Sequence, residues 1–263
     1  MMKDILNLAS YPIDQPESDE YKALAARCQS DLANSGLCDL PDFMHPQVAR
    51  RAAQDLAGTF KRDAFKHART HNIYFKKSIP GLPADHPALA RLETANRTLC
   101  TDQVGHTPLR DVYDWPPLHR FLADALGKTE LHVMDDPIAG LNVMAYAEGQ
   151  ALNWHFDRSE YTTTLLLQDP VAGGAFQYRS DLRTDTDPNY DGVAHLLQGR
   201  DPEVHEVTAT PGTLTVFRGK NTAHRVTPVQ GTTDRVIAVF CYYEQPGVAF
   251  SREERIGFYG RAQ

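Results

Sequence analysis

The strongest constraint on the fold is a change of sequence periodicity near residue 138 of this 263-residue chain. Beyond that point, short apolar or β-branched segments alternate with turns that contain Gly or Pro. The segments that have this character are 141–147, 151–157, 162–167, 175–178, 214–217, 225–226 and 236–243. Many short strands joined by such turns predict two antiparallel sheets packed face to face as a jelly roll.

Before residue 138 the start and stop signals of helices dominate. We expect helices at 19–36 (capped by Ser18 or Asp19), at 46–56 (stopped by Gly58), at 87–99 and at 117–126 (closed by Gly127). Short extended segments are expected at 37–43 and 73–75, and a long polar loop near the mouth of the site at 181–201.

These patterns predict a mainly β, α+β fold built as one domain over residues 1–263, a length that a single β-rich domain commonly reaches. Residues 1–137 are expected to form a mostly helical support. Residues 138–250 are expected to form the jelly-roll core, and 251–263 a C-terminal tail.

Charge and composition exclude several classes of protein. The formal net charge of −7 and the scatter of basic residues argue against a nucleic-acid partner. The four cysteines are far apart and form no CxxC motif, so we expect reduced thiols. The N-terminus lacks the apolar run of a signal peptide, and no stretch approaches the length of a membrane span. We expect a cytoplasmic protein with a small-molecule partner and no membrane partner; the oligomeric state, a homodimer included, stays open.

A metal site is indicated by His155, Asp157 and His224. Side chains two apart on an extended strand share a face, so His155 and Asp157 can hold one ion, and His224 begins a later strand. Two imidazoles and a carboxylate form the facial triad that holds non-haem Fe(II) and leaves coordination positions open. The same ligands can hold Zn(II) in a hydrolase, which is the alternative.

An arginine in an apolar strand adds a second constraint. Arg235 lies eleven residues past His224, within the run from Asp234 to Phe240. Such an arginine needs an anion beside it, and its two-pronged guanidinium fits the carboxylate of 2-oxoglutarate. The zinc alternative has no use for Arg235.

The order of these motifs resembles the Fe(II)/2-oxoglutarate dioxygenases. Around the metal motifs stand Tyr146-x-x-Gly149, Gly173-Gly174, Gly212-x-Leu214-x-x-Phe217-x-Gly219, and His224-x-Val226. The resemblance covers roughly the C-terminal two-fifths of the chain and implies a double-stranded β-helix (cupin-like) core. The stretch from Asn153 to Gln168, with 224–228, further resembles a bacterial group of radical halogenases of free amino acids and their lysine-hydroxylating relatives.

This resemblance implies roles for individual residues. His155, Asp157 and His224 match the iron ligands, Arg235 matches the partner of the distal 2-oxoglutarate carboxylate, and Tyr146 lies near the co-substrate. The implied cofactors are Fe(II), 2-oxoglutarate and O2, with ascorbate as a reductant. The halogenases of the group replace the carboxylate ligand with a small residue that leaves room for chloride. Because Asp157 is retained here, hydroxylation is the expected outcome.

The expected reaction is hydroxylation of an unactivated C–H of a small polar metabolite, such as the free amino acid lysine, with release of succinate and CO2. Three alternatives stay open: a peptidyl or natural-product substrate, desaturation, and a non-catalytic jelly roll that only binds a metabolite. The candidate substrate contacts, chosen from their places beside the metal motifs, are Asn153, Arg158, Glu148, Asn221 and Tyr243.

Overall fold

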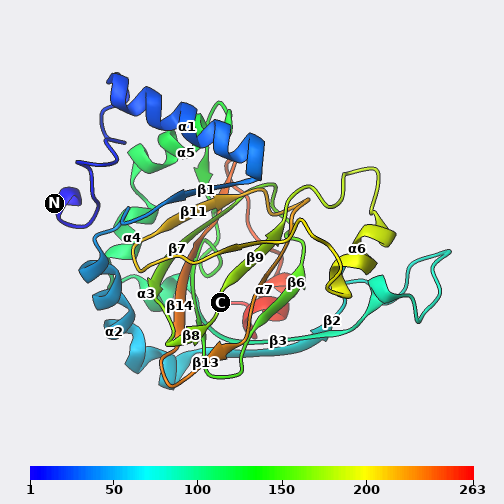
Figure 1. Cartoon of the computed structure of the whole chain (residues 1–263). Helices are drawn as coiled ribbons and strands as arrows, with labels where there is room; N and C mark the ends of the chain where they lie inside the picture. Colours follow the sequence, from blue (N-terminus) through cyan, green and yellow to red (C-terminus); the bar gives the residue numbers. More distant parts are fainter.

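A computed structural model describes all residues, 1–263, and its centre is a pair of facing antiparallel sheets (Figure 1). The larger sheet has seven strands in the order β1-β11-β7-β14-β5-β3-β2, and the smaller has four in the order β10-β9-β12-β6. The strands of the larger sheet are β1 (Leu37–Leu40), β11 (Leu214–Phe217), β7 (Thr162–Gln168), β14 (Arg235–Phe240), β5 (Leu141–Tyr146), β3 (Leu92–Leu99) and β2 (Phe65–His71). Those of the smaller are β10 (His205–Val207), β9 (Phe176–Arg179), β12 (Ala223–Val226) and β6 (Leu152–His155). The predicted fold class, α+β with a jelly-roll core, is confirmed.

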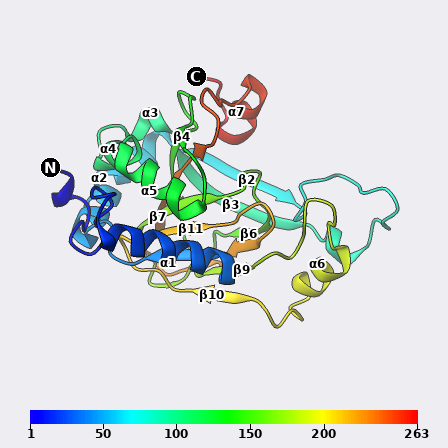
Figure 2. The same cartoon turned by 90° about the horizontal axis from the view of Figure 1, so that it is seen from above.

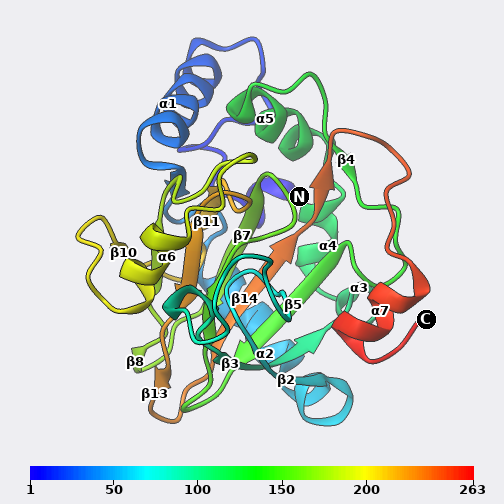
Figure 3. The ribbon, with the colours of Figure 1, turned by 90° about the vertical axis from the view of Figure 1, so that its right-hand side faces the viewer.

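Helices cover the outer face of the larger sheet. The elements concerned are α1 (Asp19–Ser35), α2 (Pro46–Asp63), α3 (Thr101–Val104), α4 (Pro108–Tyr113) and α5 (Pro116–Leu126). Helices α1 and α5 pack against each other, and both views in Figures 1 and 3 show them side by side. The side chain of Ser18 caps α1 by accepting a hydrogen bond from the Tyr21 amide, and Gly36 ends it in the left-handed conformation. None of the helices combines the length and apolar character needed to cross a bilayer.

The remaining elements are short connections. They are η1 (Met2–Asp4), η2 (Pro87–Leu89), β4 (His132–Val133), β8 (Ala172–Gly173), α6 (Tyr190–Leu197), β13 (Val229–Gln230), β15 (Tyr242–Tyr243) and α7 (Arg252–Tyr259). Helix α6 lies at the end of the molecule far from the N-terminus, as Figure 2 shows.

Strand alternation divides the larger sheet into two faces. Residues 141, 143 and 145 of β5, with 236, 238 and 240 of β14, join the main core of 37 buried residues beneath the helices. Their neighbours Met144 and Tyr146, with Arg235 and Ile237, point to the opposite side and line a cavity. Since successive strand residues face opposite ways, the packed core and the cavity wall are built by the same strands.

Several local predictions were wrong. The segment 87–99 is a single 3-10 turn followed by β3, because its residues pair with both β2 and β5. Helix α2 continues through Gly58 to Asp63, since Phe60 keeps the buried face of the helix occupied. Residues 73–75 form a turn, and the strand precedes them as β2. The expected loop 181–201 contains α6, whose start is capped by the side chain of Asn189. The strands β2 and β3 come from the segment expected to be mostly helical, whereas β1 lies within the extended segment predicted at 37–43.

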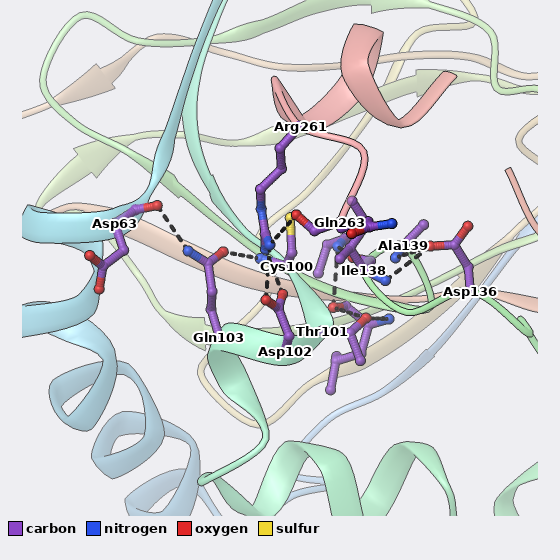
Figure 4. Close-up of polar contacts among 12 residues, drawn as sticks. Asp63, Cys100, Thr101, Asp102, Gln103, Asp136, Ile138, Ala139, Arg261 and Gln263 are labelled. Carbon is purple, nitrogen blue, oxygen red and sulfur yellow. Dashed lines mark hydrogen bonds and ion pairs between the residues drawn. The ribbon is translucent and has the colours of Figure 1, made fainter. Parts of the chain in front are cut away.

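The C-terminal segment is a docked helix rather than a tail. Its start is capped by Ser251, and α7 is held by the ion pair of Arg255 with the buried Asp136. Beyond α7, Arg261 donates hydrogen bonds to both carboxylate oxygens of Asp102, as Figure 4 shows. This docking places the aromatic rings of Phe258 and Tyr259 against the cavity.

Candidate metal centre

The three predicted metal ligands lie together on the smaller sheet. β12 pairs with β6 so that His224 is directly opposite His155, and Asp157 follows β6 by two residues. Oδ1 of Asp157 lies 3.3 Å from Nε2 of His155 and 3.4 Å from Nε2 of His224. One ligand atom from each residue falls within 4.8 Å of the other two. The facial triad of two imidazoles and one carboxylate is therefore present.

Hydrogen bonds orient each member of the triad. Nδ1 of His155 lies 2.8 Å from the Asn153 carbonyl oxygen, and Nδ1 of His224 lies 3.0 Å from that of Thr222. Because a carbonyl oxygen only accepts, each Nδ1 carries the ring proton, which leaves the Nε2 lone pair free for a metal.

Both the carboxylate and the backbone of Asp157 are held by hydrogen bonds. Thr162 donates a hydrogen bond to Oδ2, and the Asp157 amide donates one of 3.0 Å to the Gly219 carbonyl oxygen. A Cβ atom at Gly219 would lie 2.4 Å from Oδ2, a contact that no side chain tolerates. Gly219 therefore permits the close approach of its loop to Asp157.

The ionised state of Asp157 and the neutral state favoured for His155 suit a metal site. Burial opposes ionisation of Asp157, but the two histidines outweigh burial and hold its pKa well below the usual value. Burial lowers the pKa of His155. In His224, burial is outweighed by the charge of Asp157, which raises its pKa. Two imidazoles and an ionised carboxylate, buried and already converging, fit a divalent first-row metal.

Arg235 and Tyr146 form a second part of the centre. They are directly opposite each other in the pairing of β14 with β5, and each is almost fully buried. Nη1 of Arg235 is buried and has no hydrogen-bond partner. Burial raises the pKa of Tyr146 to about 12, so its hydroxyl stays protonated. A buried guanidinium with a free donor requires an anion, and a 2-oxoglutarate carboxylate fits this place.

The triad and Arg235 open into one cavity of about 860 Å³ between the two sheets. Of the predicted substrate contacts, Arg158 and Tyr243 line this cavity. Arg158 is also paired with Glu254 at 2.7 Å.

Three predicted substrate contacts do not line the cavity. His224 pairs with His155 and Val226 pairs with Leu152, so β6 has one extra residue, a bulge, between these two pairs. The bulge reverses the alternation of side chains along β6. As a result, Leu152 faces the cavity and Asn153 faces β3. Glu148 is exposed at the tip of its turn. Asn221 does not line the cavity, whereas its neighbour Lys220 does.

Sequence reasoning missed the contributions of distant segments. Arg69 and Phe75 reach the cavity from β2 and the turn after it, Arg183 from the segment before α6, and Phe258 from α7. A signal existed for Arg69, because Phe65, His67, Arg69 and His71 alternate with more exposed residues along β2. For Arg183 and Phe258 no local pattern points to the cavity.

A comparison with models of protein families shows which family this chain belongs to. Residues 22–253 match the family model described as halogenase D. The chain belongs to the halogenase D family. A comparison of this sequence with curated proteins found no match. The fold of the chain is that of the 2-oxoglutarate/Fe(II) oxygenases, and it contains a facial triad of two histidines and one aspartate.

Three solved structures represent that fold. An oxidoreductase of the 2OG-Fe(II) oxygenase family from Burkholderia pseudomallei is 14% identical, with a TM-score of 0.53 over 85% of this chain and 92% of its own. A prolyl hydroxylase from Trichoplax adhaerens, in complex with a hypoxia inducible factor fragment, is 13% identical. Its TM-score is 0.55 over 88% of this chain and 96% of its own. HygX from Streptomyces hygroscopicus, with nickel and 2-oxoglutarate bound, is 12% identical. Its TM-score is 0.55 over 82% of this chain and 85% of its own. At these identities the likeness concerns the fold.

Proposed function

We propose that this halogenase D family member is an Fe(II)- and 2-oxoglutarate-dependent enzyme that hydroxylates an unactivated C–H of a small polar metabolite. The observation that carries the proposal is the retained carboxylate of Asp157, held between the Nε2 atoms of His155 and His224. The buried, unpartnered Nη1 of Arg235 in the same cavity supports the choice of co-substrate.

For this reaction, the side chains of the protein would hold the metal ion and the co-substrate in place. Nε2 of both histidines and Oδ1 of Asp157 would hold Fe(II), while Arg235 and the Tyr146 hydroxyl would hold the distal carboxylate of 2-oxoglutarate. Fe(II) with 2-oxoglutarate supplies the chemistry: O2 is reduced as 2-oxoglutarate is converted to succinate and CO2, and a C–H of the substrate is oxidised. The cavity walls then decide which C–H is held nearest to the metal.

Hydroxylation is favoured over halogenation because the third ligand position is filled by the protein. The Asp157 carboxylate, fixed by Thr162 and packed against Gly219, occupies the space that a halide ligand would need. Halogenation is nevertheless the second candidate, since the matched family carries that name.

Succinate and product mass separate these candidates. Anaerobically loaded Fe(II) protein with 2-oxoglutarate and ascorbate is exposed to O2 in the presence of chloride and a panel of small metabolites. We expect substrate-stimulated succinate together with a product that gains one oxygen atom. Replacement of hydrogen by chlorine would identify a halogenase, and loss of two hydrogens a desaturase.

Two variants at neighbouring positions test whether succinate formation depends on the metal site. His224→Ala is expected to abolish succinate formation, whereas Arg225→Gln, at the neighbouring position on the other side of β12, should keep it. Arg225 is a suitable control because it bonds Gln177 and stacks on Trp154, away from the cavity. Full turnover by His224→Ala would refute the assignment of the metal site. Binding of 2-oxoglutarate without any succinate would replace the proposal with a non-catalytic binding protein.

A further inference from the structure

The cavity has a marked excess of positive charge. Its lining includes five basic side chains, Arg69, Arg158, Arg183, Lys220 and Arg235, and the only carboxylate in the lining is that of Asp157. The proposed function already uses Arg235 and Asp157. What remains is a substrate chamber without a free carboxylate.

Two of the remaining basic groups are neutralised and two are not. Arg158 pairs with Glu254 at 2.7 Å, and Lys220 pairs with Asp185 at 2.8 Å. Neither Arg69 nor Arg183 has an acidic partner within salt-bridge distance in any part of the chain. Two unpaired guanidinium groups that line one cavity point to anionic groups on the molecule that fills it.

Arg69 is built as an anion site next to the metal centre. Its guanidinium carbon lies 4.8 Å from the ring centroid of Phe75 and 5.9 Å from that of Phe258. Stacking on aromatic rings leaves the edge of a guanidinium free for hydrogen bonds, and Nε of Arg69 is buried without any partner. The Phe75 ring also contacts His155 edge-on, with centroids 6.2 Å apart. One aromatic ring therefore separates Arg69 from the triad.

The backbone of Phe75 is held in a strained conformation. This residue has a φ of 55°, in the left-handed region that a bulky side chain rarely adopts. The Asn72 carbonyl oxygen and side chain hold this turn, accepting hydrogen bonds from the amides of Phe75, Tyr74 and Lys76. A strained conformation that is fixed in this way, at the wall of a site, is typical of a functional constraint.

Arg183 is the second candidate anion site. Its guanidinium carbon lies 3.9 Å above the ring centroid of Phe156, the residue between His155 and Asp157. Nε and Nη2 both donate to the Lys220 carbonyl oxygen, at 2.9 Å and 2.6 Å. These bonds fix the plane of the guanidinium and leave Nη1 without an assigned partner. Arg183 thus lines the same cavity as Arg69 and the triad.

We propose that the substrate is a small acid with two anionic groups, one bound by Arg69 and the other by Arg183, and that its reacting carbon lies between them at the metal. The inference rests on the proposed function for the place of the metal and 2-oxoglutarate. It departs from the expectation of a basic amino acid such as lysine, because no cavity carboxylate other than the metal ligand could receive a side-chain ammonium group. Acidic amino acids and other small dicarboxylates have the required chemistry.

Binding measured without turnover tests this assignment. The protein is loaded with Zn(II) and saturating 2-oxoglutarate, which prevents oxidation, and its melting temperature is recorded with L-glutamate, L-leucine, L-lysine, and a series of mono- and dicarboxylic acids. We expect stabilisation to increase with the negative charge of the added compound. Calorimetry on the compound that stabilises most should show at least a tenfold weaker Kd for Arg69→Gln and for Arg183→Gln. Arg225→Gln, which alters another guanidinium stacked on an aromatic ring, should bind as the unaltered protein does.

The outcomes are separable from those of the oxygenase proposal. Stabilisation that does not increase with negative charge, tighter binding of lysine than of glutamate, or unchanged Kd values in both cavity variants would overturn the acid assignment. Succinate release with Fe(II) is measured in parallel. Charge-selective binding that depends on Arg69 but yields no succinate with any bound acid would refute the oxygenase and leave the anion site intact.

Discussion

Thr162 donates a hydrogen bond of 2.5 Å to Oδ2 of Asp157, and this bond leaves Oδ1 facing both histidine Nε2 atoms. The two residues are only five apart, so the turn from β6 into β7 fixes the carboxylate before any metal binds. Partners of this kind orient a ligand and reduce the reorganisation that metal binding requires.

Thr162→Val should therefore weaken metal binding while keeping the fold. Valine matches the shape of threonine but cannot donate, and loss of such a partner typically costs about 10–100-fold in metal affinity. The measurement is a calorimetric titration with Co(II) or Zn(II). Thr162→Ser, which keeps the hydroxyl, is the control and should bind within a few-fold of the unaltered protein. Equal affinity of the valine and serine variants would show that this bond does not orient the ligand.

Arg235→Met should uncouple stability from co-substrate binding. The buried guanidinium has an unpartnered Nη1, so an apolar chain of similar length removes an uncompensated charge from the interior. We expect a melting temperature equal to or above that of the unaltered protein without ligand. The stabilisation that 2-oxoglutarate gives to the metal-loaded protein should disappear. Retained stabilisation by 2-oxoglutarate would place its distal carboxylate elsewhere.

The sequence predicted the parts of the site that follow from local periodicity. Strand alternation placed His155 and Asp157 on one face. His224 was joined to them through the chemistry of the facial triad and the order of the motifs. Asn153 was misplaced because a one-residue bulge in β6 reverses the alternation, and a bulge leaves no clear trace in composition. The pairing of β2 with β3 is equally a tertiary effect, since 87–99 carries helix signals that sheet contacts override.

Asp136→Asn should destabilise the docking of α7. The Asp136 side chain is inaccessible to solvent, accepts hydrogen bonds from the amides of Ile138, Ala139 and Phe250, and pairs with Arg255 at 2.9 Å. Loss of its charge leaves Arg255 without its partner, which should cost about 3 kcal/mol. Denaturant unfolding measures this cost. Arg51→Gln, which breaks an exposed pair with Asp55, is the control and should change stability by less than about 1 kcal/mol.

The pH dependence of stability should report on His67. Burial, aided by the positive charge of Arg69, lowers the pKa of this cavity histidine from 6.5 to about 4. The folded state therefore binds this proton more weakly than the unfolded chain does, so stability is fully present above pH 6.5 and falls as the pH drops from 6.5 towards 4. His67→Gln should show a shallower loss of melting temperature across this window than the unaltered protein, and parallel curves would contradict the assignment. An acid bound at Arg69 would partly neutralise the guanidinium, so the pKa of His67, followed by NMR, should rise when a dicarboxylate saturates the cavity and stay unchanged in Arg69→Gln.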